Sequence, residues 1–108
     1  MKIAVSATGG SLESLVSEKF GRCEYFLIIE SESMKFEAMS NLGEKMPSGA
    51  GPKAAETIIK KGAQVILTGA IGGRAEAVLK SGNVTIVTGI AGKIKVKDAV
   101  ENYLKSNS

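Results

Sequence analysis

The stretch "QVILTGAIGGRAEAVLKSGNVTIV", residues 64–87, contains the pattern that decides the fold. Residues 65–67 (VIL) form a short apolar run that is typical of a buried strand, and residues 84–87 (VTIV) form a second one. Between these runs, Gly72-Gly73 opens a helical pattern that Gly82 closes. A strand, a helix and a strand joined by short loops predict a right-handed crossover that places the two strands parallel in one sheet.

The same alternation continues on both sides of this stretch. Pro52 is well placed as the first residue of an earlier helix, because its fixed φ suits the first turn, and Gly62 can end that helix. Residues 96–104 have the apolar spacing of a last helix. The second half of the chain therefore predicts helices that alternate with parallel strands.

The first half has a different character. Residues 2–7 read as a buried strand, residues 25–29 (YFLII) as the strongest strand of the chain, and residues 34–40 as a third. Residues 31–33 (SES) form a turn that is too short for a parallel crossover, so these strands are expected to form an antiparallel meander. We predict one α/β domain over residues 1–108, with a mixed five-stranded sheet of the ribonuclease H-like kind: an antiparallel meander, then parallel βαβ units, flanked by helices.

Composition narrows the functional classes. Hydrophobic residues make up 44% and charged residues 23%, as in a soluble globular domain, and no apolar run approaches the roughly 20 residues of a membrane helix. The single cysteine excludes an intrachain disulfide, and with no signal peptide at the start of the chain this favours the cytoplasm. Scattered lysines, 5% aromatic residues and no tryptophan argue against a nucleic-acid partner.

The inventory of reactive residues argues against an enzyme. The chain has no histidine and one cysteine, which excludes imidazole catalysis, histidine-containing zinc sites and CxxC motifs. Nucleases and ATPases of the ribonuclease H fold hold magnesium with carboxylates on central strands, whereas residues 3–7 and 65–68 contain none.

Glycines supply the positive signal. Many of the thirteen glycines stand where a strand gives way to a helix or turn, and such loops can present backbone N–H groups to an anion. Turn and cap geometry is the alternative explanation for any single loop, but several loops that face one crevice would favour ligand binding. The glycine loops in question include Gly9-Gly10, Gly49, Gly51, Gly69, Gly72-Gly73 and Gly89.

The order of these motifs resembles a known family. "EKFGRCEYFLIIE" (residues 18–30), then Asn41, then residues 48–87, resembles the dinitrogenase iron-molybdenum cofactor biosynthesis family, which includes NifX-like proteins and the C-terminal domain of NifB-like proteins. The resemblance runs from about residue 2 to 105. It implies a ribonuclease H-like fold without nuclease chemistry, and the binding or carrying of a preassembled iron–sulfur-type cluster, such as the iron-molybdenum cofactor or a precursor. Cofactor-assembly proteins are the implied partners. The three loops that look like its signature are Phe20-Gly21-Arg22, Gly49-Ala50-Gly51 and Gly69 to Gly72.

Cys23 has three possible roles at this stage. It could be a small buried residue at the start of a strand, a redox-sensing thiol, or a metal ligand whose thiolate Arg22 favours. A single thiolate cannot build a cluster, which ordinarily takes four, but it could hold one corner of a cluster that brings its own sulfides. In that case Arg22 and the loop N–H groups would meet the negative charge, and the Cys23 sulfur would face the glycine loops. Met46 is a weaker thioether candidate.

We therefore expect a non-enzymatic carrier for an anionic metallocluster. Lys19 stands where family members often have a histidine just before the Phe-Gly-Arg phrase, so a regulatory or protein-interaction module that has lost cluster binding is the first alternative. A binder of small phosphorylated ligands is the second. The predicted site comprises Arg22, Cys23, Gly49, Ala50, Gly51, Gly69, Gly72 and Gly73, with Cys23 as the metal ligand.

Overall fold

A computed structural model describes residues 1–41, 45–46, 48–90 and 93–107 of the chain. The described residues form five strands and three helices, and none of these helices is long and apolar enough to cross a membrane. In chain order the elements are β1 (Lys2–Ala7), β2 (Tyr25–Glu30), β3 (Phe36–Ser40), α1 (Ala50–Lys60), β4 (Val65–Leu67), α2 (Gly73–Ser81), β5 (Thr85–Val87) and α3 (Val96–Ser106).

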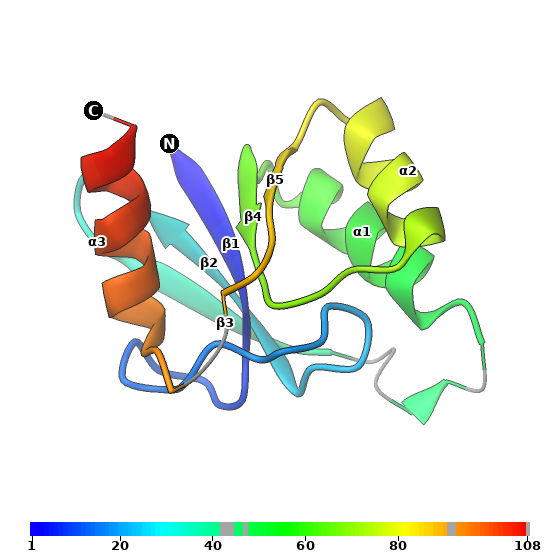
Figure 1. Cartoon of the computed structure of the whole chain (residues 1–108), viewed down its shortest axis with the longest axis horizontal. Coiled ribbons are helices and arrows are strands. Elements are labelled where there is room, and N and C mark those ends of the chain that lie inside the picture. Colours follow the sequence, from blue (N-terminus) through cyan, green and yellow to red (C-terminus); the bar gives the residue numbers. More distant parts are fainter. Residues whose placement is uncertain (42–44, 47, 91–92, 108) are drawn as a thin grey trace.

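The five strands form one mixed sheet in the order β3-β2-β1-β4-β5 (Figure 1). β1 pairs antiparallel with β2, and β2 pairs antiparallel with β3. On the other side, β1 pairs parallel with β4, and β4 pairs parallel with β5. The predicted meander and the predicted parallel crossover are both confirmed, and β1 is the strand at which they join.

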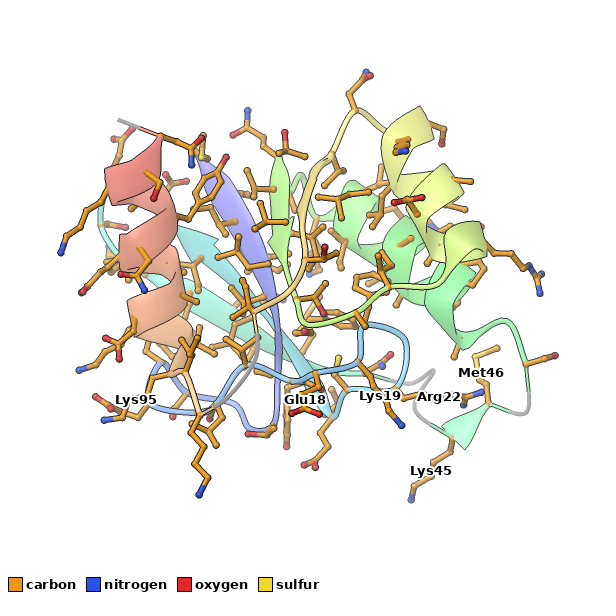
Figure 2. All side chains as sticks on the ribbon, in the orientation of Figure 1. Glu18, Lys19, Arg22, Lys45, Met46 and Lys95 are labelled. Carbon is orange, nitrogen blue, oxygen red and sulfur yellow. The ribbon has the colours of Figure 1, made fainter. Side chains whose placement is uncertain are left out.

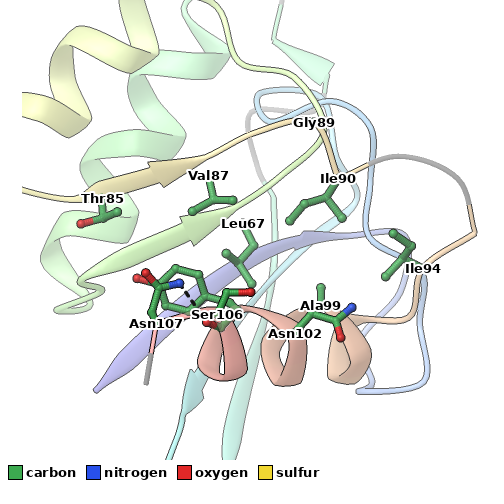
Figure 3. A pocket seen from close by; sticks show the side chains of 11 residues that line it. Leu67, Thr85, Val87, Gly89, Ile90, Ile94, Ala99, Asn102, Ser106 and Asn107 are labelled. Atoms are coloured by element: carbon green, nitrogen blue, oxygen red, sulfur yellow. Dashed lines mark hydrogen bonds between the residues drawn. The ribbon is translucent and has the colours of Figure 1, made fainter.

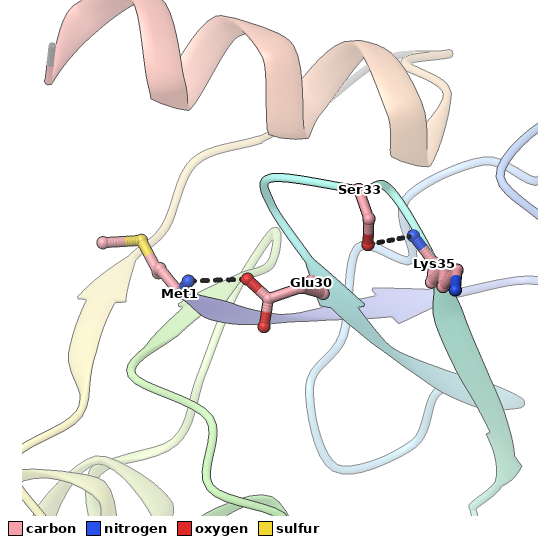
Figure 4. Close-up of polar contacts among 4 residues, drawn as sticks. All are labelled: Met1, Glu30, Ser33 and Lys35. Carbon is pink, nitrogen blue, oxygen red and sulfur yellow. Dashed lines mark hydrogen bonds and ion pairs between the residues drawn. The ribbon is translucent and has the colours of Figure 1, made fainter.

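The turn between β2 and β3 shows why the third strand starts later than expected. Met34 has a φ of 60°, a left-handed conformation that no strand residue adopts, so β3 begins at Phe36 rather than at residue 34. Figure 4 shows the polar contacts around this turn. The Ser33 hydroxyl accepts a hydrogen bond from the Lys35 N–H at 3.2 Å, and the N-terminal ammonium pairs with Glu30 at 2.7 Å.

The first helix also begins at a different residue from the one predicted. α1 starts at Ala50, so Pro52 is its third residue and not its first. The preceding Gly49 has a φ of 75°, which a residue with a Cβ rarely adopts, and this turn starts the helix early. The end of the helix is as predicted, because Gly62 has a φ of 82° and donates its N–H to Ile59 at 3.0 Å.

Helices cover the sheet unequally on its two faces. Figure 1 shows α1 and α2 on one face and α3 alone on the other. One hydrophobic cluster packs under α1 and α2, and a second packs between the sheet and α3. The strand residues that alternate toward α3 include Ile3, Val5, Leu27, Ile29, Val65 and Leu67, and those toward α1 and α2 include Ala4, Phe26, Ile28 and Ile66.

A clasp of charged residues ties the loop after β1 to the start of α3. Glu13 accepts from Lys95 at 2.8 Å and from Lys97 at 2.9 Å. The backbone adds to this contact, because Val96 donates its N–H to Ser14 O at 2.8 Å. The hydrogen bond from Lys95, then that from Lys97, lowers the pKa of Glu13 to about 2.

We expect Glu13→Gln to lower the urea midpoint of unfolding at neutral pH. The difference in midpoint between the variant and the wild type should depend on pH. The folded-state pKa lies below the ordinary value of 4.5, so the clasp stabilises the fold above pH 4.5 and loses its effect as the pH falls toward 2. Urea unfolding at several pH values tests this. The two curves should converge near pH 2, and salt should narrow their separation at pH 7.

Glu56→Gln is the matched control, because Glu56 is an exposed carboxylate on α1 with no ion pair to any described residue. If the midpoint of Glu13→Gln differed from that of the wild type as much at pH 2 as at pH 7, the ion pairs of the clasp would not be the source of the stability that Glu13 contributes.

Candidate functional site

A crevice lies where the parallel strands end. The loops after β1 and β4 and the connection from β5 to α3 meet at this edge, together with the loop that enters β2. Two adjoining hollows of about 520 and 420 Å³ share Glu18 and Lys19 as lining residues. The remaining described residues of this crevice are Thr8, Leu15, Val16, Ser17, Arg22, Gly69, Ala70 and Lys93.

Gly69 allows the floor of the crevice to form. A Cβ on Gly69 would lie 2.5 Å from the Cα and the carbonyl oxygen of Glu18, closer than any side chain can approach. The Ala70 N–H donates to Glu18 O at 2.7 Å, and the Phe20 N–H donates to Ala70 O at 3.0 Å. The segment that carries Glu18 and Lys19 is thus pressed against the end of β4, and its two charged side chains are placed at the lip of the crevice.

The crevice contains more positive than negative charge. Lys19, Arg22 and Lys93 line the larger hollow, and Glu18 is the single carboxylate among the described lining residues. All four are exposed residues. Figure 2 shows Glu18, Lys19 and Arg22 side by side at this edge. Such an arrangement attracts an anion and keeps it accessible to water.

Arg22 also has a structural task. Its Nη1 donates a hydrogen bond to the carbonyl oxygen of Met46, in the segment that precedes α1. Lys45 and Met46 lie beyond Arg22 in Figure 2. Arg22 therefore lines the crevice and also ties the loop before β2 to Met46.

Cys23 lies in the core and not in the crevice. Its side chain is 2% exposed and belongs to the hydrophobic cluster under α1 and α2, with Phe20 and Phe26, whose ring centroids are 5.2 Å apart. The Asn41 amide donates to Cys23 O at 2.9 Å and approaches Cys23 Sγ at 3.8 Å. The expectation that this sulfur faces the glycine loops is therefore wrong. The turn at Gly21 and Arg22, before β2, explains the outcome: Phe20 and Cys23 on either side of it are buried, and Arg22 is exposed.

Gly21 and Gly51, from the first two signature loops, serve close packing. A Cβ on Gly21 would meet the Cα and N of Gly51 at 3.0 Å, and a Cβ on Gly51 would meet Ala75 at 3.1 Å. Ala50 is buried as well. Gly51 thus joins the loop before β2 to α1 and α2, whereas a Cβ on Gly49 would meet nothing within 4 Å. Gly49, Ala50 and Gly51 are not among the described residues that line the two hollows.

The glycines at the start of α2 have a different environment. A Cβ added to Gly72 or Gly73 would meet nothing within 4 Å, and both residues are exposed. Gly72 is the N-cap of α2 and has no side-chain cap. Of the predicted site residues, Arg22 and Gly69 therefore line the crevice, whereas Gly72 and Gly73, three and four residues after Gly69, do not line either hollow.

A hydroxyl pair occupies the ends of the two central strands. Ser6 and Thr68 are fully buried, and their hydroxyl oxygens are 2.7 Å apart. The Ser6 hydroxyl donates to Ser17 O at 3.1 Å, so Thr68 must donate to Ser6. Among the described residues no three His, Cys, Asp or Glu side chains come close enough to hold a metal ion. The two hydroxyls at the strand ends therefore hold the segment that contains Ser17 in place, and they offer no metal site among the described residues.

Three lining residues with charged side chains were absent from the predicted site. These residues are Glu18, Lys19 and Lys93. Each follows the end of β1 or β5, at the sheet edge where ligands of open α/β folds bind. Their position after strand ends was the signal that could have identified them.

Comparisons with known proteins agree with this fold. The family model described as "Dinitrogenase iron-molybdenum cofactor" matches residues 1–106. The apo form of the orange protein from Desulfovibrio gigas is 33% identical, with a TM-score of 0.93, and the match covers 97% of this chain and 88% of that one. A Thermotoga protein assigned to NifB is 28% identical, with a TM-score of 0.82 and coverage of 96% and 87%. No curated protein sequence matches the chain.

The contrast between Gly69 and Gly72 yields a stability prediction. Gly69→Ala should destabilise the fold by roughly 1–3 kcal/mol, because its Cβ would collide with the backbone of Glu18. Gly72→Ala is the matched control and should cost less than about 1 kcal/mol, since it meets open space at an N-cap. Chemical denaturation of both variants measures the difference. Equal losses would mean that the close approach at Gly69 does not constrain the crevice.

Proposed function

The chain belongs to the dinitrogenase iron-molybdenum cofactor family, and we propose that it is a non-enzymatic carrier domain whose crevice binds an anionic, sulfide-rich metallocluster as cargo. The observation that carries this proposal is the gathering of Lys19, Arg22 and Lys93 around one hollow at the ends of the parallel strands. The whole of residues 1–108 would act as a single binding domain in the cytoplasm, with cofactor-assembly proteins as partners.

The cargo would be held by charge and hydrogen bonds rather than by coordination. The only cysteine is buried, and the chain has no histidine, so the crevice offers neither a thiolate nor an imidazole. An ammonium has three donors and a guanidinium has five, and charge-assisted hydrogen bonds to an anion are the stronger class. A cluster that brings its own sulfides presents acceptors to these groups and needs no ligand from the protein.

The same arrangement supports a carrier over a catalyst. The ends of β1 and β4, where ribonuclease H-like enzymes place metal-binding carboxylates, hold the hydrogen-bonded Ser6 and Thr68. Exposed cations bind an anion reversibly, because solvent and salt compete with them. A carrier needs this reversibility in order to deliver its cargo.

A small phosphorylated ligand is the second candidate, and the same three cations favour it. Oxyanions and sulfide-rich clusters both accept hydrogen bonds from lysine and arginine. A competition experiment distinguishes the cluster from the phosphorylated ligand. Inorganic phosphate at millimolar concentration should not displace a cluster that contacts all three cations, but it should displace a small phosphorylated ligand.

We predict that Lys19→Gln combined with Lys93→Gln weakens binding of tetrathiomolybdate, a dianion of molybdenum and sulfide, by tenfold or more. Each lost charge near the ligand should contribute on the order of 1 kcal/mol, or about fivefold. Anaerobic titration followed by absorbance measures the affinity, and added salt should weaken wild-type binding more than binding by the variant.

Two matched variants complete this experiment. Lys35→Gln removes one exposed positive charge just before β3, away from the crevice, and should leave the affinity for tetrathiomolybdate unchanged. This control shows whether the change in net charge alone weakens binding. Cys23→Ala should bind tetrathiomolybdate like the wild type and lose only about 1 kcal/mol of stability. Loss of binding in Cys23→Ala, in a protein that remains folded, would contradict binding by charge and revive the thiolate as a ligand.

A further inference from the structure

The sheet has an open edge at β5. No described strand lies beyond β5 in the sheet, and Figure 1 shows this strand in front of the other strands, with the helices to either side. Burial changes accordingly: all of β4 is buried, whereas Thr85 is exposed and Ile86 and Val87 are half-buried.

The backbone of Ile86 faces outward at this edge. In a parallel ladder, alternate residues of a strand turn their N–H and C=O toward the same neighbour. Thr85 donates to Gln64 O at 2.9 Å and Val87 accepts from the Thr68 N–H at 3.1 Å, so both face β4 and the loops around it. Ile86, between them, therefore presents its N–H and C=O to the open side of the sheet, where an added strand could pair with it.

An apolar groove lies directly beside this edge. It has a volume of about 430 Å³ and runs between β5 and α3, because α3 alone covers that face and leaves β5 partly open (Figure 3). None of the described residues that line it is charged, although 23% of the chain is. The lining comprises Leu67, Val87, Gly89, Ile90, Ile94 and Ala99, with polar groups at the rim from Thr85, Asn102, Tyr103, Ser106 and Asn107.

We propose that an extended, uncharged peptide segment of a partner protein adds to the sheet beside β5. Its backbone would pair with the outward N–H and C=O of Ile86, and the apolar side chains at every second position would enter the groove. The neutral lining selects against charged side chains in those positions, because a charge buried there would have no partner. The opposite edge is less suited, since its exposed strand β3 carries a charged residue, Glu37, which pairs with Lys61 at the end of α1 at 2.8 Å.

The size of the groove favours a peptide over a second copy of this chain. A stable interface between proteins ordinarily uses about 20–30 residues on each side. The groove is lined by eleven described residues, and β5 has three. A transient peptide contact fits this area, whereas a stable dimer would need more. The site is also separate from the cluster crevice, although the connection from β5 to α3 borders both, with Lys93 in the crevice and Ile94 in the groove.

Titration of the isotope-labelled protein with a short peptide of alternating valine and threonine, blocked at both ends, tests the proposal by NMR. We expect amide shifts centred on Ile86 and on the groove, and slower hydrogen exchange at the Ile86 amide. The same peptide with every second backbone nitrogen methylated cannot form the ladder and should bind at least tenfold more weakly. Asn102→Glu, at the rim, should weaken binding similarly, and Ala77→Glu, an exposed position on α2, should not.

Four results would overturn the proposal: no shifts at saturating peptide, equal binding of the methylated peptide, shifts confined to β3, or concentration-dependent dimers in sedimentation with Ile86 protected. The last result would assign the edge to a second copy of this chain. None of these outcomes depends on the crevice, so they leave the carrier function to its own test.

Discussion

The close approach of the Glu18 backbone to Gly69 is the contact on which the crevice depends. It is possible only because Gly69 has no side chain, and it places the segment after β1 across the ends of the central strands. The segment is then held from three sides: by the loop after β4, by the buried Ser6 hydroxyl and by the start of α3. Charged side chains that are distant in sequence, such as Lys19 and Lys93, reach one hollow as a result.

The exposed positive charge in the crevice is consistent with delivery of a cargo. The cations of the crevice are exposed, so their attraction for an anion is moderate and screened by salt. Arg22 differs from the lysines because its guanidinium also donates a hydrogen bond to Met46 O. The fold thus separates two tasks: buried groups hold the loops in place, and exposed groups meet the ligand.

Much of the fold could be predicted from the sequence, because its strongest signals are local. Apolar runs located the central strands, glycines marked the ends of α1 and α2, and a short turn required β2 and β3 to be antiparallel. The boundaries that were wrong depend on backbone conformation at single residues, namely Met34 and Gly49. The site was harder to predict, since whether Cys23 points inward depends on the packing of Phe20 and Phe26 around it. The positions of the glycines in the sequence could not distinguish Gly51, which packs against Gly21, from Gly72, which faces open space.

The central claim is that an anionic cluster binds in the crevice without a ligand from the protein, and the position of the metal tests it most directly. Crystals of the protein loaded anaerobically with tetrathiomolybdate would locate molybdenum by anomalous diffraction. Our account predicts a single strong peak at the strand ends, within reach of Lys19 and Lys93 and with only inorganic sulfide bonded to the metal. A peak bonded to the Cys23 sulfur, or one located away from this edge of the sheet, would contradict it.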